Sequence, residues 1–305
     1  MPVAVSACLT GQAVRYDGSD AAHALPHREL AGVFDYVPVC PEVGVGMGAP
    51  RPPIRLVAEG GGLRAVGAHD ANLDVTDALN AFGRRQAERL ADVCGHIFMT
   101  RSPSCGLDSV KVRAEVRGEP QRTDGRGVYA ATLLIERPNL PAEENERLFD
   151  PARRSAFINR TLAYAHWRRL ERDGLTAQRL IEFHARHKYL LMAHSVPHYG
   201  RAGRLLSDLR PDAAALAPNY LACLMAGLSR PATPAGHANA LSHMQGHLKR
   251  RLDRSETACL TQAIDQCRTG AKPVADACAL LRCALDRHPD PYLDNQTYFA
   301  AARWF

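Results

Sequence analysis

Short apolar runs at residues 3–7, 36–39 and 96–100 alternate with helical patterns along the first half of the chain. Their length and their Gly, Pro and Ser borders are typical of buried strands. Between the second and third runs, the apolar positions of residues 75–93 keep mostly to one helical face, and Asp74 can cap that helix. Strands that alternate with helices predict an α/β fold with an open parallel sheet.

Three smaller features complete the first half. Residues 54–58 and 63–66 predict a hairpin, which we expect at the periphery of the fold. Residues 110–112 predict a strand that extends the sheet. Residues 127–137 predict a further helix, which ends before Pro138.

The pattern becomes helical after residue 148. A stretch rich in proline and acidic residues, 138–151, marks the change. The sequence therefore predicts two domains, an α/β domain over residues 1–148 and a second, all-α domain over residues 149–305. The helical patterns of the second domain cover residues 151–173, 176–195, 200–209, 212–229, 234–253, 255–268 and 273–287.

Charge is divided unevenly between the two halves. Residues 1–150 contain 16 Lys and Arg against 20 Asp and Glu, whereas residues 151–305 contain 22 against 12, which gives net charges of −4 and +10. A basic half beside a mildly acidic one indicates contact with a polyanion such as RNA. The alternative is a solvated surface of Arg-rich helices.

The chain shows no signal for a membrane. No apolar run approaches the roughly 18 residues that span a bilayer, and the first residues lack the basic and apolar regions of a signal peptide. We therefore expect a cytoplasmic protein with no membrane contact. In such a chain the nine cysteines are expected to be reduced thiols or metal ligands, because disulfides are rare in that compartment.

Three cysteines follow three of the predicted strands: Cys8 follows the first run, Cys40 the second and Cys105 the third. If these strands are parallel neighbours, the sulfur atoms meet in the crevice at the carboxyl edge of the sheet, where open α/β folds place their ligands. Three thiolates in one crevice imply a metal, although each cysteine taken alone is more often a small buried side chain. The other cysteines are interpreted as core or surface thiols: Cys94, Cys223, Cys259, Cys267, Cys278 and Cys283.

The type of ligand narrows the choice of metal. Three thiolates suit an iron-sulfur cluster or zinc. A fourth protein ligand is not evident in this half, so one coordination position would stay open for a substrate, as in catalytic zinc sites. The cysteines are widely spaced and have no C-x-x-C signature, so the spacing leaves both metals open.

Polar residues beside these cysteines are candidates for catalysis and substrate binding. Glu42, two residues after Cys40, could act as a general base on a water molecule, or its carboxylate could simply bind loop amides. Ser102 and Ser104 could orient a substrate or hold the turn. Asp17, in an Asp-Gly turn, has the same two interpretations.

The histidines of the second half form two groups. At helical spacing they could build a metal site. We favour polar or hydrogen-bonded roles, because no carboxylate accompanies them in an H-E-x-x-H pattern. The residues are His184, His187, His194 and His198 in one group and His243 and His247 in the other.

Three motifs surround the cysteines and together span nearly all of residues 1–140. They are Ser6-Ala7-Cys8-Leu9 with Arg15-Tyr16-Asp17-Gly18, Cys40-Pro41-Glu42 with a glycine-rich run to Pro50-Arg51, and Ser102-Pro103-Ser104-Cys105-Gly106. In this order they resemble the thiouracil desulfurase family of iron-sulfur proteins. The run of residues 183–189, Phe-His-Ala-Arg-His-Lys-Tyr, resembles a helical domain of unknown function that is fused behind such desulfurase domains.

The resemblance implies a 4Fe-4S cluster with a free iron that takes up the sulfur of the substrate. It implies an oxygen-sensitive enzyme that converts a thiolated pyrimidine, 2-thiouracil, to uracil with release of sulfide and without redox change. Glu42 would activate water or shuttle a proton, and Ser102 would assist at the substrate. Asp17 and Ser104 are candidates for binding the substrate. The implied cluster ligands are Cys8, Cys40 and Cys105.

Two other functions fit the same residues. The first is an RNA-binding protein whose cluster is structural or senses the redox state, with the basic helical half as the binding surface. The second is a zinc enzyme that uses the same three thiolates.

Overall fold

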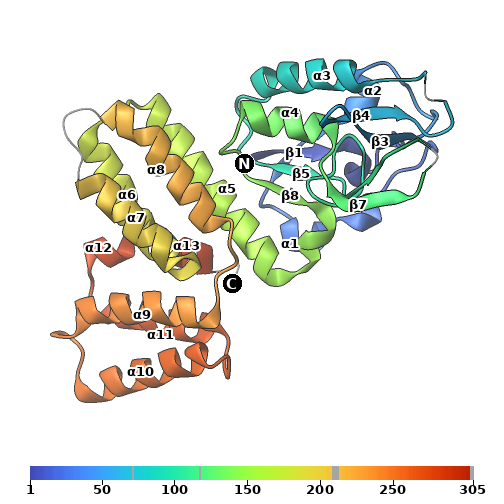
Figure 1. Cartoon of the computed structure of the whole chain (residues 1–305). Helices are drawn as coiled ribbons and strands as arrows, with labels where there is room; N and C mark the ends of the chain where they lie inside the picture. Colours follow the sequence, from blue (N-terminus) through green and yellow to red (C-terminus); the bar gives the residue numbers. More distant parts are fainter. Residues whose placement is uncertain (71, 117, 208–212, 303–305) are drawn as a thin grey trace. The chain divides into compact units, whose positions relative to one another are not determined.

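The computed structural model describes the chain except for residues 71, 117, 208–212 and 303–305. The chain divides into two compact units, Met1–Asp150 and Pro151–Phe305. All strands of the described chain lie in the first unit, and the second is built from helices (Figure 1). The predicted fold class, an open parallel sheet followed by an all-α region, is confirmed. Among the described residues, no helix combines the length and the apolar character needed to cross a membrane.

Four parallel strands form the first sheet. β1 (Pro2–Ser6) lies between β2 (Asp35–Val39) and β5 (His96–Phe98), and β8 (Ala142–Glu144) lies on the other side of β5. Residues 3–6 and the whole of β5 are buried, as expected of parallel strands that are covered on both faces. The order β2-β1-β5-β8 places the three predicted strands side by side, with their carboxyl ends at one edge.

A second sheet, which the sequence did not predict, has the order β4-β3-β6-β7. The predicted hairpin is confirmed, but the expectation that it is peripheral is wrong, because its first strand also pairs in parallel with β6. For the same reason the strand expected at residues 110–112 belongs to this sheet and does not extend the first one. The strands are β3 (Ile54–Glu59), β4 (Gly62–Gly67), β6 (Val110–Arg113) and β7 (Pro120–Gly125).

Two helices of the first unit, α3 (Thr76–Arg89) and α4 (Val128–Glu136), pack against each other (Figure 1). They approach closely at Gly83, where an added Cβ atom would lie 2.8 Å from the Cβ atom of Thr132. A larger residue at position 83 would therefore separate the helices. Buried residues of both helices and of the second sheet share one apolar core: Ile54, Leu56, Ala65, Val75, Leu79, Val110, Val112 and Val128.

Asp74 does not occupy the capping position of α3 that the sequence predicted for it, because that position is held by Val75. The Asp74 carboxylate accepts hydrogen bonds from the backbone N–H (2.9 Å) and the hydroxyl (2.6 Å) of Thr76, and it pairs with Arg64 at 2.6 Å. It therefore fixes the start of the helix from the residue before the cap. The other helices of this unit are short: η1 (Ala7–Thr10), η2 (Ala22–Ala24), α1 (His27–Leu30), α2 (Pro41–Gly44) and η3 (Asn145–Phe149).

Helices follow one another through the second unit, largely where the sequence predicts them. The third helix, predicted over residues 200–209, begins earlier, at Val196. Pro197 lies in its first turn, where its missing N–H has no helical partner to lose. The helix ends predicted at residues 208–212 lie outside the described residues, and the sequence did not predict the last two helices. The helices are α5 (Pro151–Arg172), α6 (Ala177–His194), α7 (Val196–Ser207), α8 (Ala213–Leu228), α9 (Pro234–Leu248), α10 (Arg254–Arg268), α11 (Val274–Arg287), α12 (Pro291–Asp294) and α13 (Thr297–Ala301).

Buried histidines are part of the core of the helical unit. His187 stacks on Phe183, with ring centroids 4.0 Å apart, and its Nδ1 donates to the Phe183 carbonyl at 2.8 Å. Burial lowers the pKa to about 3 for His187 and His237, and to about 4 for His184 and His194. These imidazoles are therefore neutral in the folded protein at neutral pH.

We expect the free energy of unfolding to fall as the pH drops below about 6.5, the ordinary pKa of histidine. Each buried histidine gains a proton in the unfolded chain below that pH, but in the folded chain only near its lowered pKa. Each therefore costs about 1.4 kcal/mol of stability per pH unit in between. Denaturant titrations of the full chain between about pH 7.5 and pH 5, followed by circular dichroism, measure this slope.

Two matched variants test the origin of the slope. His194→Gln removes a buried histidine. It should therefore lower the slope of the unfolding free energy against pH by about 1.4 kcal/mol per pH unit, which corresponds to one proton. His243→Gln, at an exposed position, should leave the slope as it is. An unchanged slope in His194→Gln would contradict the explanation.

Candidate functional site

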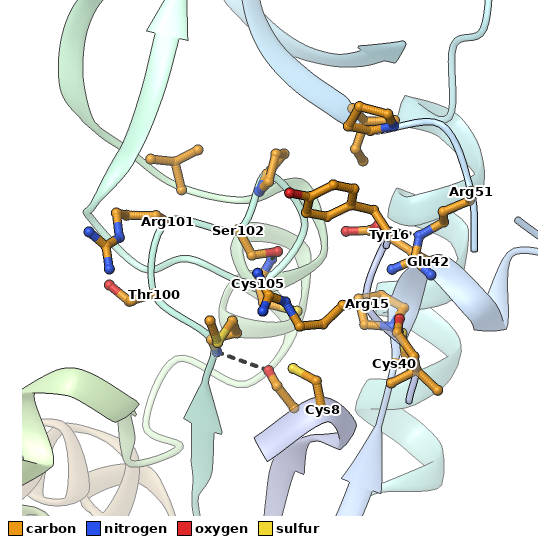
Figure 2. Close-up of a pocket in the computed structure, with 18 of the residues that line it drawn as sticks. Cys8, Arg15, Tyr16, Cys40, Glu42, Arg51, Thr100, Arg101, Ser102 and Cys105 are labelled. Atoms are coloured by element: carbon orange, nitrogen blue, oxygen red, sulfur yellow. Dashed lines mark hydrogen bonds and ion pairs between the residues drawn. The ribbon is translucent and has the colours of Figure 1, made fainter. Parts of the chain in front are cut away.

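The three cysteines of the motifs lie at the carboxyl ends of three adjacent parallel strands. Cys8 lies in η1 directly after β1, Cys40 directly follows β2, and Cys105 lies in the loop after β5. Because β1 pairs with both β2 and β5, the three loops meet at one edge of the sheet. All three side chains line one cavity of about 500 Å³ (Figure 2).

Both sheets contribute to this cavity. The loops at the end of the first sheet form part of its wall, and residues of β3 and β6 form another part. The second sheet is thus needed to complete the site. Besides the cysteines, the lining includes Arg15, Tyr16, Arg51, Thr100, Arg101 and Ser102 from the loops, Glu42 from α2, and Ile54, Arg55, Val110, Lys111 and Arg113 from the second sheet.

Ser6 and Met99 tie two of the cysteine loops together. Ser6 is the last residue of β1, and its hydroxyl oxygen accepts a hydrogen bond of 2.9 Å from the backbone N–H of Met99, directly after β5. The loop that carries Cys8 and the loop that carries Cys105 are therefore fixed to each other where they begin.

Burial disfavours the thiolate form of all three cysteines. It raises the pKa of Cys8 to about 11, with a further contribution from the nearby Cys40, and it raises the pKa of Cys40 and, far more, that of Cys105. The positive charges of Arg15 and Arg51 oppose these pKa shifts at Cys8 and Cys40 respectively. Buried or half-buried thiols whose charges repel one another ionise readily only where a cation compensates the negative charge, as a bound metal does.

The two metals considered from the sequence need different arrangements of their sulfur donors. In the part of the chain that the structure describes, no group of three or more His, Cys, Asp or Glu side chains is arranged to hold a metal ion. A zinc site gathers its sulfur ligands about 2.3 Å from one ion. The cysteine ligands of a 4Fe-4S cluster bind different iron atoms, and three thiols spaced around a cavity suit that group.

Glu42 lies on the cavity wall, and each of its carboxylate oxygens has a side-chain partner. Oε2 accepts a hydrogen bond from Nε of Arg51 at 2.7 Å, and Oε1 accepts one from the hydroxyl of Ser104 at 2.8 Å. Arg51 also donates from Nη1 to the carbonyl of Gly48 at 2.7 Å. The side chains of Arg51 and Glu42 are only 4% and 12% exposed. Side chains from two other segments therefore hold the carboxylate in one orientation.

Ser102 and Ser104 take different positions. Ser102 lines the cavity, and its oxygen accepts hydrogen bonds from the backbone N–H groups of Ser104 (3.3 Å) and Cys105 (3.1 Å), so it faces the cavity and holds the turn. Ser104 is fully buried outside the cavity lining and donates to Glu42. This geometry does not support Ser104 as a substrate-binding residue; its hydroxyl orients the Glu42 carboxylate.

Asp17 is exposed and is not part of the cavity lining. Its carboxylate accepts hydrogen bonds from the hydroxyl (2.6 Å) and the backbone N–H (3.0 Å) of Ser19, and these bonds lower the pKa of Asp17. Asp17 therefore closes its own turn, and the geometry does not support it as a substrate-binding residue. Its neighbours Arg15 and Tyr16 line the cavity instead.

The cavity carries more positive charge than the sequence analysis indicated. Among its described lining residues, Glu42 is the one carboxylate against six cationic side chains. The alternation of Lys111 and Arg113 with buried valines puts them on one face of a strand, but the pairing of β6 with β3 decides which cavity that face lines. The other cationic residues lie in or beside segments that carry a predicted strand or motif. The cationic residues are Arg15, Arg51, Arg55, Arg101, Lys111 and Arg113.

Five of the six histidines that the sequence singles out in the helical unit form a hydrogen bond, and the sixth, His243, is exposed. Contact between this unit and RNA stays a prediction that rests on the net positive charge of the unit. The hydrogen-bond partners are the Tyr220 hydroxyl for His184, the Phe183 carbonyl for His187, the Arg230 carbonyl for His194, the Ser195 hydroxyl for His198 and the Tyr189 hydroxyl for His247.

Comparison with known proteins finds matches for both units. The family described as 2-thiouracil desulfurase matches residues 3–145, and a family described as a protein of unknown function, DUF1722, matches residues 188–301. The uncharacterized protein YbgA of Escherichia coli (strain K12) is 31% identical over 142 residues, which are 46% of this chain and 84% of YbgA. The solved structure of a [4Fe-4S]-dependent thiouracil desulfidase, TudS, is 25% identical, with a TM-score of 0.36, and the match covers 49% of this chain and 93% of that one.

The two family matches confirm the resemblance that the sequence motifs indicated. The family match covers all three motifs, and the DUF1722 match falls within the helical unit. The chain belongs to the 2-thiouracil desulfurase family and carries a DUF1722 domain of unknown function in its helical unit.

Proposed function

We propose that the α/β unit removes sulfur from a thiolated pyrimidine, with 2-thiouracil as the simplest substrate, and releases uracil and sulfide. The observation that carries the proposal is the gathering of Cys8, Cys40 and Cys105 with Glu42 around one cavity, in a chain of this family. The overall reaction exchanges the thiocarbonyl sulfur for the oxygen of water and yields hydrogen sulfide. It consumes no oxidant or reductant.

The three cysteines would hold a 4Fe-4S cluster. Their soft sulfur donors come from three separate loops around a cavity of about 500 Å³, which suits this group. When bound, the cluster supplies an iron atom with an open coordination position, which acts as a Lewis acid toward the sulfur of the substrate. The other lining residues then orient the substrate and move its protons.

Glu42 is our candidate for the general base. A carboxylate has about four acceptor positions, of which Arg51 and Ser104 use two. A remaining position can accept a proton from a water molecule as the water oxygen adds to the thiocarbonyl carbon. The carboxyl group can then return this proton to the departing sulfur, so that Glu42 acts as a proton shuttle.

Ser102 and the cationic side chains would stabilise the reacting atoms. Negative charge develops on the substrate as water adds to it, and a positive charge on the cavity wall such as that of Arg15 favours that state. Because the Ser102 oxygen accepts two backbone hydrogen bonds, its own O–H proton is available to a substrate atom in the cavity.

Oxygen-free preparation of the full chain should yield a brown protein with about four iron and four acid-labile sulfide per chain. This protein should convert 2-thiouracil to uracil with equal amounts of sulfide and uracil. Cys105→Ala should lose both iron and turnover. Cys94→Ala, which removes a buried thiol outside the cavity lining, should keep both. Colourless protein with stoichiometric zinc, or no sulfide release from the iron-loaded parent, would overturn the proposal.

Glu42→Gln should keep the iron and lower kcat by about 10²- to 10⁴-fold, because the amide retains the shape of the side chain but cannot act as a base. Anaerobic kinetics together with iron content measure both effects. Glu136→Gln, at an exposed position of the same unit, is the control and should match the parent. An unchanged kcat in Glu42→Gln would remove this residue from the mechanism.

Arg51→Met should lower kcat by about tenfold or more, because the buried Glu42 carboxylate loses a charged hydrogen-bond donor. Arg51→Lys should recover part of this loss, since lysine can reach one of the two acceptors that arginine binds. Circular dichroism shows whether both variants keep the fold. Equal kcat values in the two variants and the parent would show that Arg51 does not position Glu42.

A further inference from the structure

Arg101 has a backbone conformation that residues with side chains disfavour. Its φ angle is +59°, in the left-handed region, and no other non-glycine residue of the described chain has a positive φ. A Cβ atom crowds the neighbouring carbonyl oxygen in this region, so glycine adopts it readily and arginine does not. Arg101 stands at the start of the loop that leads to Cys105, so the surrounding structure must hold it there.

A buried carboxylate holds this backbone through one intermediate hydroxyl. The N–H of Arg101 donates to Oγ of Ser109 at 2.8 Å, and the Ser109 hydroxyl donates to Oε1 of Glu144 at 2.6 Å. Glu144 is the last residue of β8, the strand next to β5, and it is 1% exposed. Ser109 therefore joins the strained residue to a carboxylate on the neighbouring strand.

The same carboxylate binds the chain on both sides of Cys105. Oε1 of Glu144 also accepts a hydrogen bond of 2.7 Å from the backbone N–H of Leu107, and the hydroxyl of Thr100 lies 3.2 Å from Oε2. In the next residue, Asn145, the side-chain oxygen Oδ1 accepts a hydrogen bond of 2.8 Å from the backbone N–H of Thr100. A buried carboxylate with several directed partners fixes the position of the groups around it.

We propose that Glu144, acting through Ser109, is a positioning residue that holds Arg101 in its left-handed conformation. This conformation places Ser102 and Cys105 on the cavity wall, where Figure 2 shows them with Arg101. The two residues are linked, because the Ser102 oxygen accepts a hydrogen bond of 3.1 Å from the backbone N–H of Cys105. Only the effect of this positioning on turnover rests on the proposed function.

The test compares two double variants that differ by one carbon atom. Ser109→Ala removes the link between Glu144 and the backbone of Arg101, and either Arg101→Gly or Arg101→Ala is added to it. Both double variants lack the guanidinium group, but only glycine adopts a positive φ without strain. Amide hydrogen exchange of residues 101–107, measured on the full-length chain without iron, reports on the loop directly and does not depend on desulfuration.

Ser109→Ala should make exchange in residues 101–107 about tenfold faster. Without the hydrogen bond to Ser109, Arg101 can leave the disfavoured positive φ, and the loop opens more often. Exchange in α3 and α4 should stay as in the parent, which separates loop positioning from a general loss of stability. Adding Arg101→Gly should restore slow exchange, and adding Arg101→Ala should not. Glu144→Gln, which keeps the shape and one acceptor oxygen, should give an intermediate increase.

Two outcomes would overturn the proposal: parent-like exchange in Ser109→Ala, or equal exchange in the two double variants. In iron-loaded protein, kcat for 2-thiouracil should fall in Ser109→Ala and be higher in the double variant with glycine than in the one with alanine. If the iron-loaded parent does not desulfurate 2-thiouracil, the proposed function fails, while the exchange rates still decide the role of Glu144.

Discussion

The parallel pairing of β1 with both of its neighbours determines where the candidate site lies. Parallel strands end at the same edge of their sheet, so Cys8, Cys40 and Cys105, far apart in the sequence, reach one cavity. Burial then disfavours thiolate charge at each of them and raises each pKa. The sheet therefore brings together a set of thiols whose ionisation requires a compensating cation.

The strands of the first sheet and their cysteines could be predicted because each signal is local: a short apolar run followed by a loop of Gly, Pro or Ser. The second sheet could not, because Leu56 of β3 pairs in parallel with Val112 of β6, and no local pattern specifies a partner so distant in the sequence. The same pairing brings Lys111 and Arg113 to the cavity, which explains why the cationic wall was also missed.

Polar residues of the loops were predicted less well than the thiols, because a hydroxyl or carboxylate can serve a substrate or the backbone. Asp17 uses its oxygens on Ser19, and Ser104 gives its proton to Glu42. The sequence shows that a donor or an acceptor is present, but its partner depends on the folded loops. Glu42 was found because it adjoins a cysteine, whereas the contact that orients it, from Arg51, needs the loop between them to fold back.

The order of the strands along the chain has a consequence for biosynthesis. β8 is the last strand of the α/β unit, and Asn145 directly after it holds the backbone of Thr100. When Cys105 leaves the ribosome, the residues that anchor its loop have not yet emerged. The proposed cluster can enter a preformed site only after residue 145 has emerged and the unit has folded. Until then the thiols of the nascent chain are accessible to oxidants and to competing metal ions.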